Sequence, residues 1–324
     1  MKKQFFKGYF LLICSFTLLM FSCKKTTSVE DEVVTEEVQM QVQSEDSEMM
    51  SSETESVDDD ATNTASSSAR FCGLGNILGG GSLSIDTDTS NPGGGVRTIT
   101  INYNGRINGC RKRTGSITVE LLNAPRWIEP GATLKVTFNN FKVENVCRNK
   151  SVTLNGQRFI TNVNGGNHFK LQQGLVSSLV HKVRTGATGI TATFTDSLGT
   201  KTANWNAAKT TTISYTSTPR KFNYEVVGDT TINTKANTEA WGTSRFSRSY
   251  QTVINNTIKS NTFCGLWRPT AGNVSHFVGT SNVQVAFGLN AMGNPVGLGD
   301  CAGFFKVTYT NASGVSSSRV LPYR

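Results

Sequence analysis

The sequence predicts an all-β protein of antiparallel, sandwich-like sheets that include two related disulfide-closed units. Gly, Thr, Asn, Ser and Val dominate residues 70–324, and short runs of alternating apolar and polar residues recur there. Such alternation, bounded by Gly, Pro and Asn, is typical of strands with one buried face. The cysteines of this region also occur in recurring local contexts, which predicts the two closed units.

The alternating runs place the strands along the chain. Six are clear: residues 97–103, 116–121, 133–138, 188–194, 282–287 and 305–309. Residues 175–183 are ambiguous, and their valines and flanking glycines favour a strand over a helix. About 255 residues suit one large all-β domain or two small ones. We therefore divide the region into residues 70–220, with the first cysteine unit and the middle strands, and a C-terminal unit, residues 221–324.

The N-terminus has the features of an export signal. Lys2 and Lys3 precede an apolar run, residues 9–21, that is shorter than the roughly 20 residues of a membrane span. The run ends at Ser22-Cys23, which resembles the lipobox of bacterial lipoproteins. That resemblance implies a signal peptide over residues 1–22, cleavage after Ser22 and acylation of Cys23. The expected product is lipid-anchored to the cell envelope at the outer membrane.

Charge is divided sharply between the segments that follow. Residues 24–69 carry two lysines against thirteen Asp and Glu, whereas residues 70–324 carry 27 Lys and Arg against ten Asp and Glu. The acidic stretch has no aromatic residue, and its Val and Met residues form no sustained apolar stripe. We therefore predict a disordered acidic tether over residues 23–69, loosely attracted to the basic body without fixed structure.

Five cysteines remain after Cys14 and Cys23, an odd number for an exported chain. Phe71-Cys72-Gly73-Leu74 recurs as Phe263-Cys264-Gly265-Leu266, and each motif precedes a second cysteine by 37 or 38 positions. This repeat favours the disulfides Cys72–Cys110 and Cys264–Cys301, with Cys147 as a buried free thiol. The pairing Cys110–Cys147, also 37 positions apart, stays open.

Several blocks of the body resemble lipoproteins of the Bacteroidota type. They are the run Arg97–Tyr103 with Gly109-Cys110 and residues 115–119; Arg126-Trp127 with residues 129–132 and 137–141; residues 199–202 with Trp205; and residues 299–301. The resemblance implies a β-rich exported lipoprotein and implies no activity.

Patterns typical of enzymes and metal sites are weak. The ten carboxylates of the body are scattered, mostly beside turns, and none of the three histidines lies in a nucleophile motif. No Cys or His pair has zinc spacing, and residues 86–97 lack the Gly and Glu of a calcium loop. We therefore expect no catalytic residues, no metal and no cofactor.

Basic residues near tryptophans give the one candidate ligand face. Its residues are Arg111, Arg113, Arg126, Trp127, Trp241, Trp267 and Arg268. Cations beside aromatic rings suit an acidic glycan or lipopolysaccharide phosphates, and no nucleic-acid motif is present. The alternative is a solvated positive surface whose nearest partner is the acidic tether. The leading hypothesis is a non-enzymatic, membrane-anchored binding or structural module; the alternative is a carbohydrate-active or other envelope hydrolase, which needs converging carboxylates.

Overall fold

The computed structural model describes residues 36–66, 83–88, 98–297 and 300–323. It contains one long helix, one short helix and fifteen strands in these residues. The helices are α1 (Glu36–Ser66) and α2 (His168–Gln172). The strands are β1 (Leu83–Asp88), β2 (Thr98–Asn108), β3 (Arg111–Leu122), β4 (Ala132–Asn145), β5 (Lys150–Asn162), β6 (Leu179–Asp196), β7 (Gly199–Ser217), β8 (Arg220–Gly228), β9 (Thr230–Ile232), β10 (Lys235–Thr243), β11 (Ser249–Asn261), β12 (Ala271–Val278), β13 (Ser281–Leu289), β14 (Phe304–Thr310) and β15 (Ser316–Pro322).

The all-β, antiparallel prediction is confirmed, and the six predicted runs lie in strands, apart from Arg97, which is outside the described residues. The layers differ from a sandwich because all fifteen strands belong to one sheet. Its order follows the chain from β1 to β7, passes to β10 and continues to β15, while β8 pairs with β7 and β11 and β9 pairs with β10. The sheet is therefore continuous across the predicted division at residue 220, which falls at the first residue of β8.

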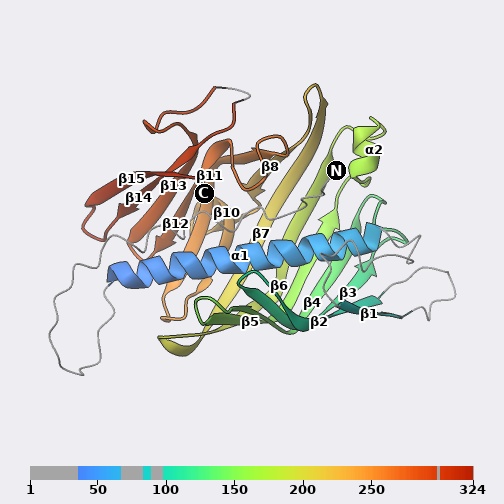
Figure 1. Cartoon of the computed structure of the whole chain (residues 1–324), viewed down its shortest axis with the longest axis horizontal. Coiled ribbons are helices and arrows are strands. Elements are labelled where there is room, and N and C mark those ends of the chain that lie inside the picture. Colours follow the sequence, from blue (N-terminus) through green and yellow to red (C-terminus); the bar gives the residue numbers. More distant parts are fainter. Residues whose placement is uncertain (1–35, 67–82, 89–97, 298–299, 324) are drawn as a thin grey trace.

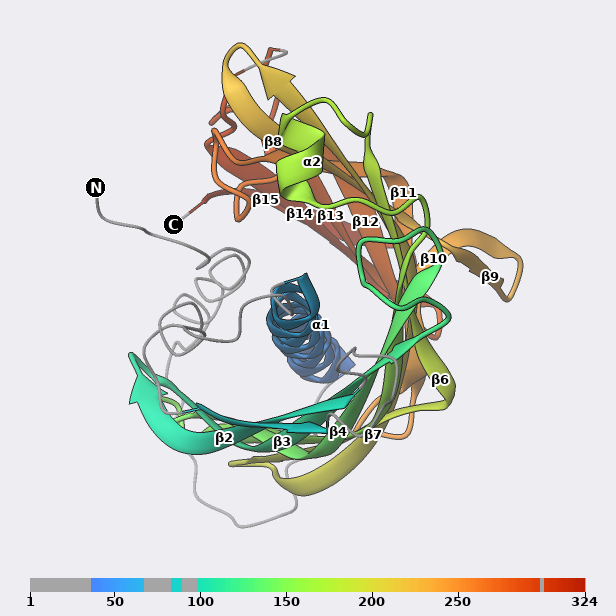
Figure 2. The same cartoon turned by 90° about the vertical axis from the view of Figure 1, so that its right-hand side faces the viewer.

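The sheet curves around α1, which lies in its concave side (Figures 1 and 2). We call this concave side the trough. Neighbouring strands change register near Gly115, Asn140, Gly156 and Gly189, so a row of bulges crosses the sheet from β3 to β6. A bulge bends its strand and increases the local twist. Gly115, in this row, has a φ of +86°, and a Cβ there would lie 2.1 Å from the carbonyl oxygen of Asn140.

Strand β4 shows how the bulge keeps apolar residues in the trough. Leu134, Val136 and Phe138 are buried before the bulge, and Phe141 and Val143 are buried after it. The buried side chains thus have even residue numbers before the bulge and odd numbers after it. The extra residue of the bulge moves the even-numbered side chains to the other face of the sheet. These residues belong to the largest core cluster, which also contains Met and Val side chains of α1.

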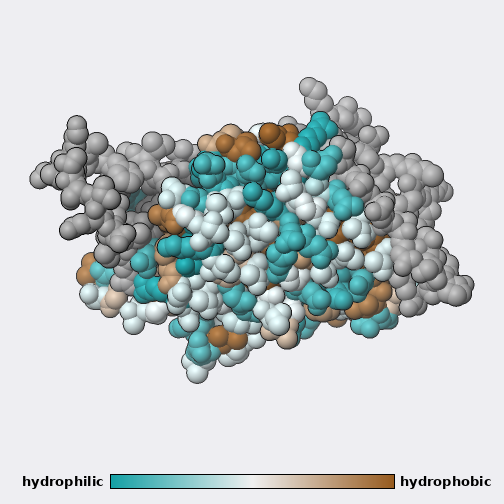
Figure 3. All heavy atoms as spheres, turned by 90° about the horizontal axis from the view of Figure 1, so that it is seen from below, coloured by the Kyte–Doolittle hydropathy of each residue, from teal (hydrophilic) through white to brown (hydrophobic). Residues whose placement is uncertain are grey.

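Among the described residues, no other buried cluster approaches this one in size. Figure 3 shows one side of the molecule as a mixture of hydrophilic and neutral residues, with apolar residues in small separate groups. Two smaller clusters lie elsewhere, one centred on Leu171, Leu179 and Ile213 and the other on Ala302, Phe305 and Tyr323. The main apolar interface of the fold is therefore the one between the sheet and α1.

The structure differs from the sequence prediction in the acidic segment. Residues 36–66, expected as part of a disordered tether, form α1 against the sheet, and the remainder of residues 23–69 lies outside the described residues. Residues 175–183 are divided, because strand β6 begins only at Leu179. No helix among the described residues is long and apolar enough to cross a membrane.

One predicted disulfide is confirmed and the other is wrong. Cys264 is bonded to Cys301, but Cys110 is bonded to Cys147 and not to Cys72. The reason is strand pairing: β3 pairs with β4, and the amide of Val146 donates to the carbonyl of Cys110 at 2.8 Å, which brings the two cysteines to a Cα–Cα distance of 5.3 Å. Cys147 is therefore not a free thiol. Cys72 lies outside the described residues.

Candidate functional site: a basic trough occupied by an acidic helix

The side of α1 that faces the sheet follows a regular stripe. Its residues recur at alternating intervals of three and four: Met40, Gln43, Ser47, Met50, Thr54, Val57, Ala61 and Thr64. All except Ser47, which is half-buried, are buried. This is the spacing of one seam of a coiled coil. Half of the stripe is polar, and most of its side chains are Ser, Thr, Ala or Val and therefore small.

Carboxylates flank this stripe on a row of every seventh residue, Asp46, Glu53 and Asp60. α1 carries ten Asp and Glu and no Lys or Arg. The rise of an α-helix separates successive members of the row by about 10.5 Å. Each of the three carboxylates forms an ion pair with a cation of the sheet or of the turn after β10.

Glu53 and Asp60 contact the arginines of β3. Arg111 and Arg113 are two residues apart on the strand and therefore share a face. Both donate to Glu53, whose side chain is 1% exposed, and Arg113 also lies 3.5 Å from Asp60. The Tyr103 hydroxyl donates to Asp60 at 3.0 Å. Burial raises the pKa of Asp60, and the Arg113 guanidinium opposes that shift.

Asp46 contacts the turn that follows β10. Arg245 is fully buried; its Nε donates to one oxygen of Asp46 at 2.6 Å and its Nη2 to the other at 2.5 Å. Its Nη1 donates to Asp196 at 2.7 Å, and its guanidinium stacks 4.4 Å from the Phe194 ring. Lys150 of β5 reaches Asp46 at 3.0 Å. A bidentate guanidinium–carboxylate pair of this kind fixes both position and orientation.

The other flank of α1 contacts β5 and β7. Asp58 accepts from Nη2 of Arg158 at 2.8 Å, and Glu55 accepts from Lys209. Arg158 is 1% exposed and lies over the Trp205 ring at 5.5 Å. Cations thus hold the helix on both sides of its stripe, and aromatic rings lie beneath several of them.

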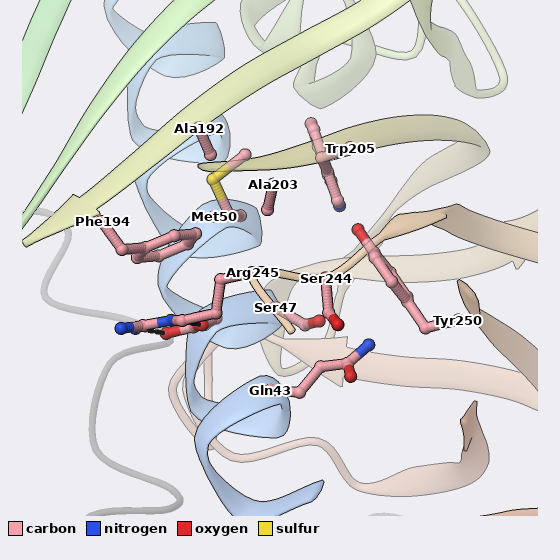
Figure 4. Close-up of a pocket in the computed structure, with 11 residues that line it drawn as sticks. Gln43, Ser47, Met50, Ala192, Phe194, Ala203, Trp205, Ser244, Arg245 and Tyr250 are labelled. Carbon is pink, nitrogen blue, oxygen red and sulfur yellow. Dashed lines mark hydrogen bonds and ion pairs between the residues drawn. The ribbon is translucent and has the colours of Figure 1, made fainter. Parts of the chain in front are cut away.

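Little space separates α1 from the sheet. Near Asp46 a cavity of about 20 Å³ remains, the volume of roughly one water molecule. Figure 4 shows Gln43, Ser47 and Met50 of α1 pointing toward Trp205 and Tyr250 of the sheet across this space. The trough is therefore filled by the helix.

Buried carboxylates converge at the C-terminal half of α1. Burial raises the pKa of Asp58 to about 6 against the opposing charge of Arg158, and it raises that of Asp59 to about 8. Burial also raises the pKa of Glu239, near Lys209 and Glu55. Such shifted pKa values are common at functional sites. A hydrolase, however, needs room for a substrate between its carboxylates, and α1 fills this part of the trough.

The structure distributes the seven residues of the sequence-predicted ligand face over several places. Arg111 and Arg113 lie in the trough beneath α1. Arg126 is 68% exposed and pairs with Glu129, whereas its neighbour Trp127 is 3% exposed and packs against His181.

The other three residues lie elsewhere on the sheet. Trp241 lines an open groove of about 380 Å³ together with Arg184. Trp267 and Arg268 stack on each other at 4.3 Å near the C-terminal cluster. The seven residues therefore form no single face, and only the arginines of β3 reach α1.

Sequence reasoning missed most cations of the trough. Lys150, Arg158 and Lys209 have no tryptophan next to them in the sequence, and only strand pairing brings them together. The stripe of α1 was detectable as a repeat of three and four, but Gln, Ser and Thr occupy half of its positions and conceal it in a search for apolar residues. Among the described residues, no group of three or more His, Cys, Asp and Glu has an arrangement suited to a metal ion.

Comparison with family models, with curated proteins and with solved structures found no match for this chain.

Proposed function

We propose that this chain is a non-enzymatic binding module, anchored to the outer membrane of the cell envelope through acylated Cys23. The lipobox-like Ser22-Cys23 and the resemblance of the body to lipoproteins of the Bacteroidota type support the proposed localisation at the membrane. The two disulfides fit an oxidising compartment. The proposed ligand is an elongated anionic molecule that binds in the trough, and acidic glycans and lipopolysaccharide phosphates belong to that class.

One observation carries the proposal: cations of the sheet line the trough, and carboxylates of α1 neutralise them. Arg245 and Arg158 are essentially buried beneath the helix, and Arg111 and Arg113 share Glu53. Without those carboxylates, a row of desolvated cations over aromatic rings would face the ligand. Buried charges lacking partners are costly, so the trough should bind any anion that fits it.

The test measures polyanion binding by the full mature chain. A triple variant, Asp46→Asn, Glu53→Gln and Asp58→Asn, removes three charges of α1 and should elute from heparin at higher salt than the wild type. Adding Arg111→Gln and Arg113→Gln should abolish the gain, because those arginines lie beneath α1.

A matched control variant separates the effect of the trough on heparin binding from the effect of net charge. Glu120→Gln, Glu129→Gln and Glu225→Gln remove three carboxylates whose ion pairs involve only residues of the sheet and its loops. The proposal requires a clearly larger gain from the α1 variant than from this control. Equal gains would show that heparin responds to net charge alone and would contradict a trough site.

A further inference from the structure

We infer that the trough is a receptor for an acidic helix of a second polypeptide and that α1 is the built-in competitor for this site. The inference rests on the proposed trough as a binding site for an elongated anionic ligand, and it narrows that ligand to an acidic helix in place of a glycan or lipopolysaccharide.

The shape of the trough fits an α-helix. α1 lies within the curve of the sheet along its 31 residues (Figure 2). Its stripe of small and flexible side chains packs on apolar residues of the trough, and the largest core cluster includes both. An amphipathic helix that lies in a groove through positions spaced three and four apart is a recurring mode of peptide recognition.

The positions of the cations determine which helix positions must carry an acidic residue. Asp46, Glu53 and Asp60 fall on one row at seven-residue intervals, and each lies against a cation of the body. Arg245 pairs with Asp46, and Arg113 pairs with both Glu53 and Asp60. Moving the acids of this row to another side of the helix would leave buried Arg245 with Asp196 as its carboxylate partner and would remove the acceptor of its Nε and Nη2. A ligand helix is therefore specified by the positions of its acids as well as by their number.

The fit of α1 is incomplete at Arg158. This side chain is 1% exposed and makes a single ion pair, through Nη2, with Asp58. Its Nε and Nη1, and the second oxygen of Asp58, have no hydrogen-bond partner among the described residues. A longer glutamate at this position would extend its carboxylate toward the free donors of the guanidinium. A helix with such a side chain should displace α1.

The position of α1 in the chain allows exchange. Sixteen residues, 67–82, separate Ser66 from the first residue of β1. α1 takes part in no strand pair, so its departure would leave the described strand pairings unchanged. Because α1 is tethered, its effective concentration at the site is high, on the order of millimolar for a short linker, and a competing helix must bind well to replace it.

The experiment uses labelled peptides and the full mature chain. The probe is a peptide with the sequence of residues 36–66, titrated against the triple variant Asp46→Asn, Glu53→Gln and Asp58→Asn, whose own α1 is weakened. Binding should be at least tenfold tighter than to the wild-type chain, in which α1 competes. The same peptide with Asp58→Glu should bind more tightly than the unmodified peptide.

A register-shifted peptide is the matched control, because it has the same composition and net charge. Its changes are Ser44→Asp with Asp46→Ser, Ser51→Glu with Glu53→Ser, and Asp60→Thr with Thr62→Asp. It should bind at least tenfold more weakly than the unmodified peptide. Peptide mapping of Cys110–Cys147 and Cys264–Cys301 verifies that each protein variant retains its folded body.

The outcomes separate this inference from the proposed function. Equal binding of both peptides, or binding of heparin with no binding of either peptide, would overturn the helix receptor and leave an anion-binding trough. Register-dependent peptide binding without any heparin response would support the helix receptor and contradict a general polyanion site.

Discussion

Arg245 and Asp46 form a bidentate ion pair across 199 residues of sequence, with the guanidinium fully buried against Phe194. Asp46 belongs to the acidic helix, and Arg245 belongs to the turn after β10. The pair shows that the acidic segment is part of the folded structure and that its attraction to the basic body has defined geometry. The predicted loose, unstructured attraction is replaced over residues 36–66 by specific buried contacts.

Asp46→Ala should release the N-terminal half of α1 from the trough. Removing one partner of a buried pair costs up to about 3–5 kcal/mol. Arg245 would stay buried with Asp196 as its remaining carboxylate partner, so the cost should lie at or below the lower end of that range. Hydrogen exchange of residues 36–66 should accelerate strongly. Asp229→Ala is the control, because Asp229 pairs with the largely exposed Arg184 and its loss should cost at most about 1 kcal/mol. Equal protection of α1 in both variants would contradict the role of Asp46.

Docking of the C-terminal half of α1 should weaken as pH rises from 5 to 9. Burial raises the pKa of Asp59 to about 8 in the docked state, so the docked helix binds a proton more tightly than the free one. This contribution is fully present below the ordinary pKa of 3.8 and is lost as pH rises through 8. Asp59→Asn should reduce the pH dependence of α1 protection against hydrogen exchange, and an unchanged dependence in that variant would refute the assignment.

The sheet should lose stability as pH falls below 6.5 because of His276. Burial lowers the pKa of this imidazole to about 4, and the Thr252 hydroxyl lies 2.9 Å from its Nδ1. The unfolded chain therefore binds the proton first, so the stability is complete above about pH 6.5 and falls by about 1–3 kcal/mol toward pH 4. Urea unfolding of the wild type and of His276→Gln at pH 7 and 4.5 measures the difference, which should be smaller in the variant.

The disulfide Cys110–Cys147 should stabilise the body by about 2–4 kcal/mol, because it closes a loop with a sequence separation of 37 residues. The double variant Cys110→Ala with Cys147→Ala should unfold at a lower denaturant concentration, and Cys264→Ala with Cys301→Ala offers a matched comparison. Peptide mapping without reductant should recover both bridges. A peptide that joins Cys72 to Cys110 would contradict the observed pairing.

Cys23→Ala should release the protein from membranes, because the proposed lipid anchor is attached to that thiol. The measurement is the distribution of the chain between washed membranes and the soluble fraction. A variant that stays with the membranes would show that something other than acylation of Cys23 holds the protein there.

Much of the sheet was predictable from sequence, because strand alternation is a local property. Residues 133–138, for example, alternate in the printed sequence and lie in β4 with the expected buried face. The bridge between Cys264 and Cys301 was also accessible, from a repeated motif and its spacing. The same motif misled at Cys72, because sequence similarity around a cysteine does not determine which strands pair.

The sequence by itself determined an antiparallel β protein with an acidic segment before a basic body. Tertiary structure alone decided that the acidic segment is a helix in a curved sheet. The isolated helix is intrinsically weak: its carboxylates repel one another and half of its stripe is polar. Arg111, Arg158 and Arg245 come from three distant places in the chain, and only the paired strands and their bulges bring these charges around α1. The long-range pairing of charge therefore stabilises the helix, and no local pattern reveals it.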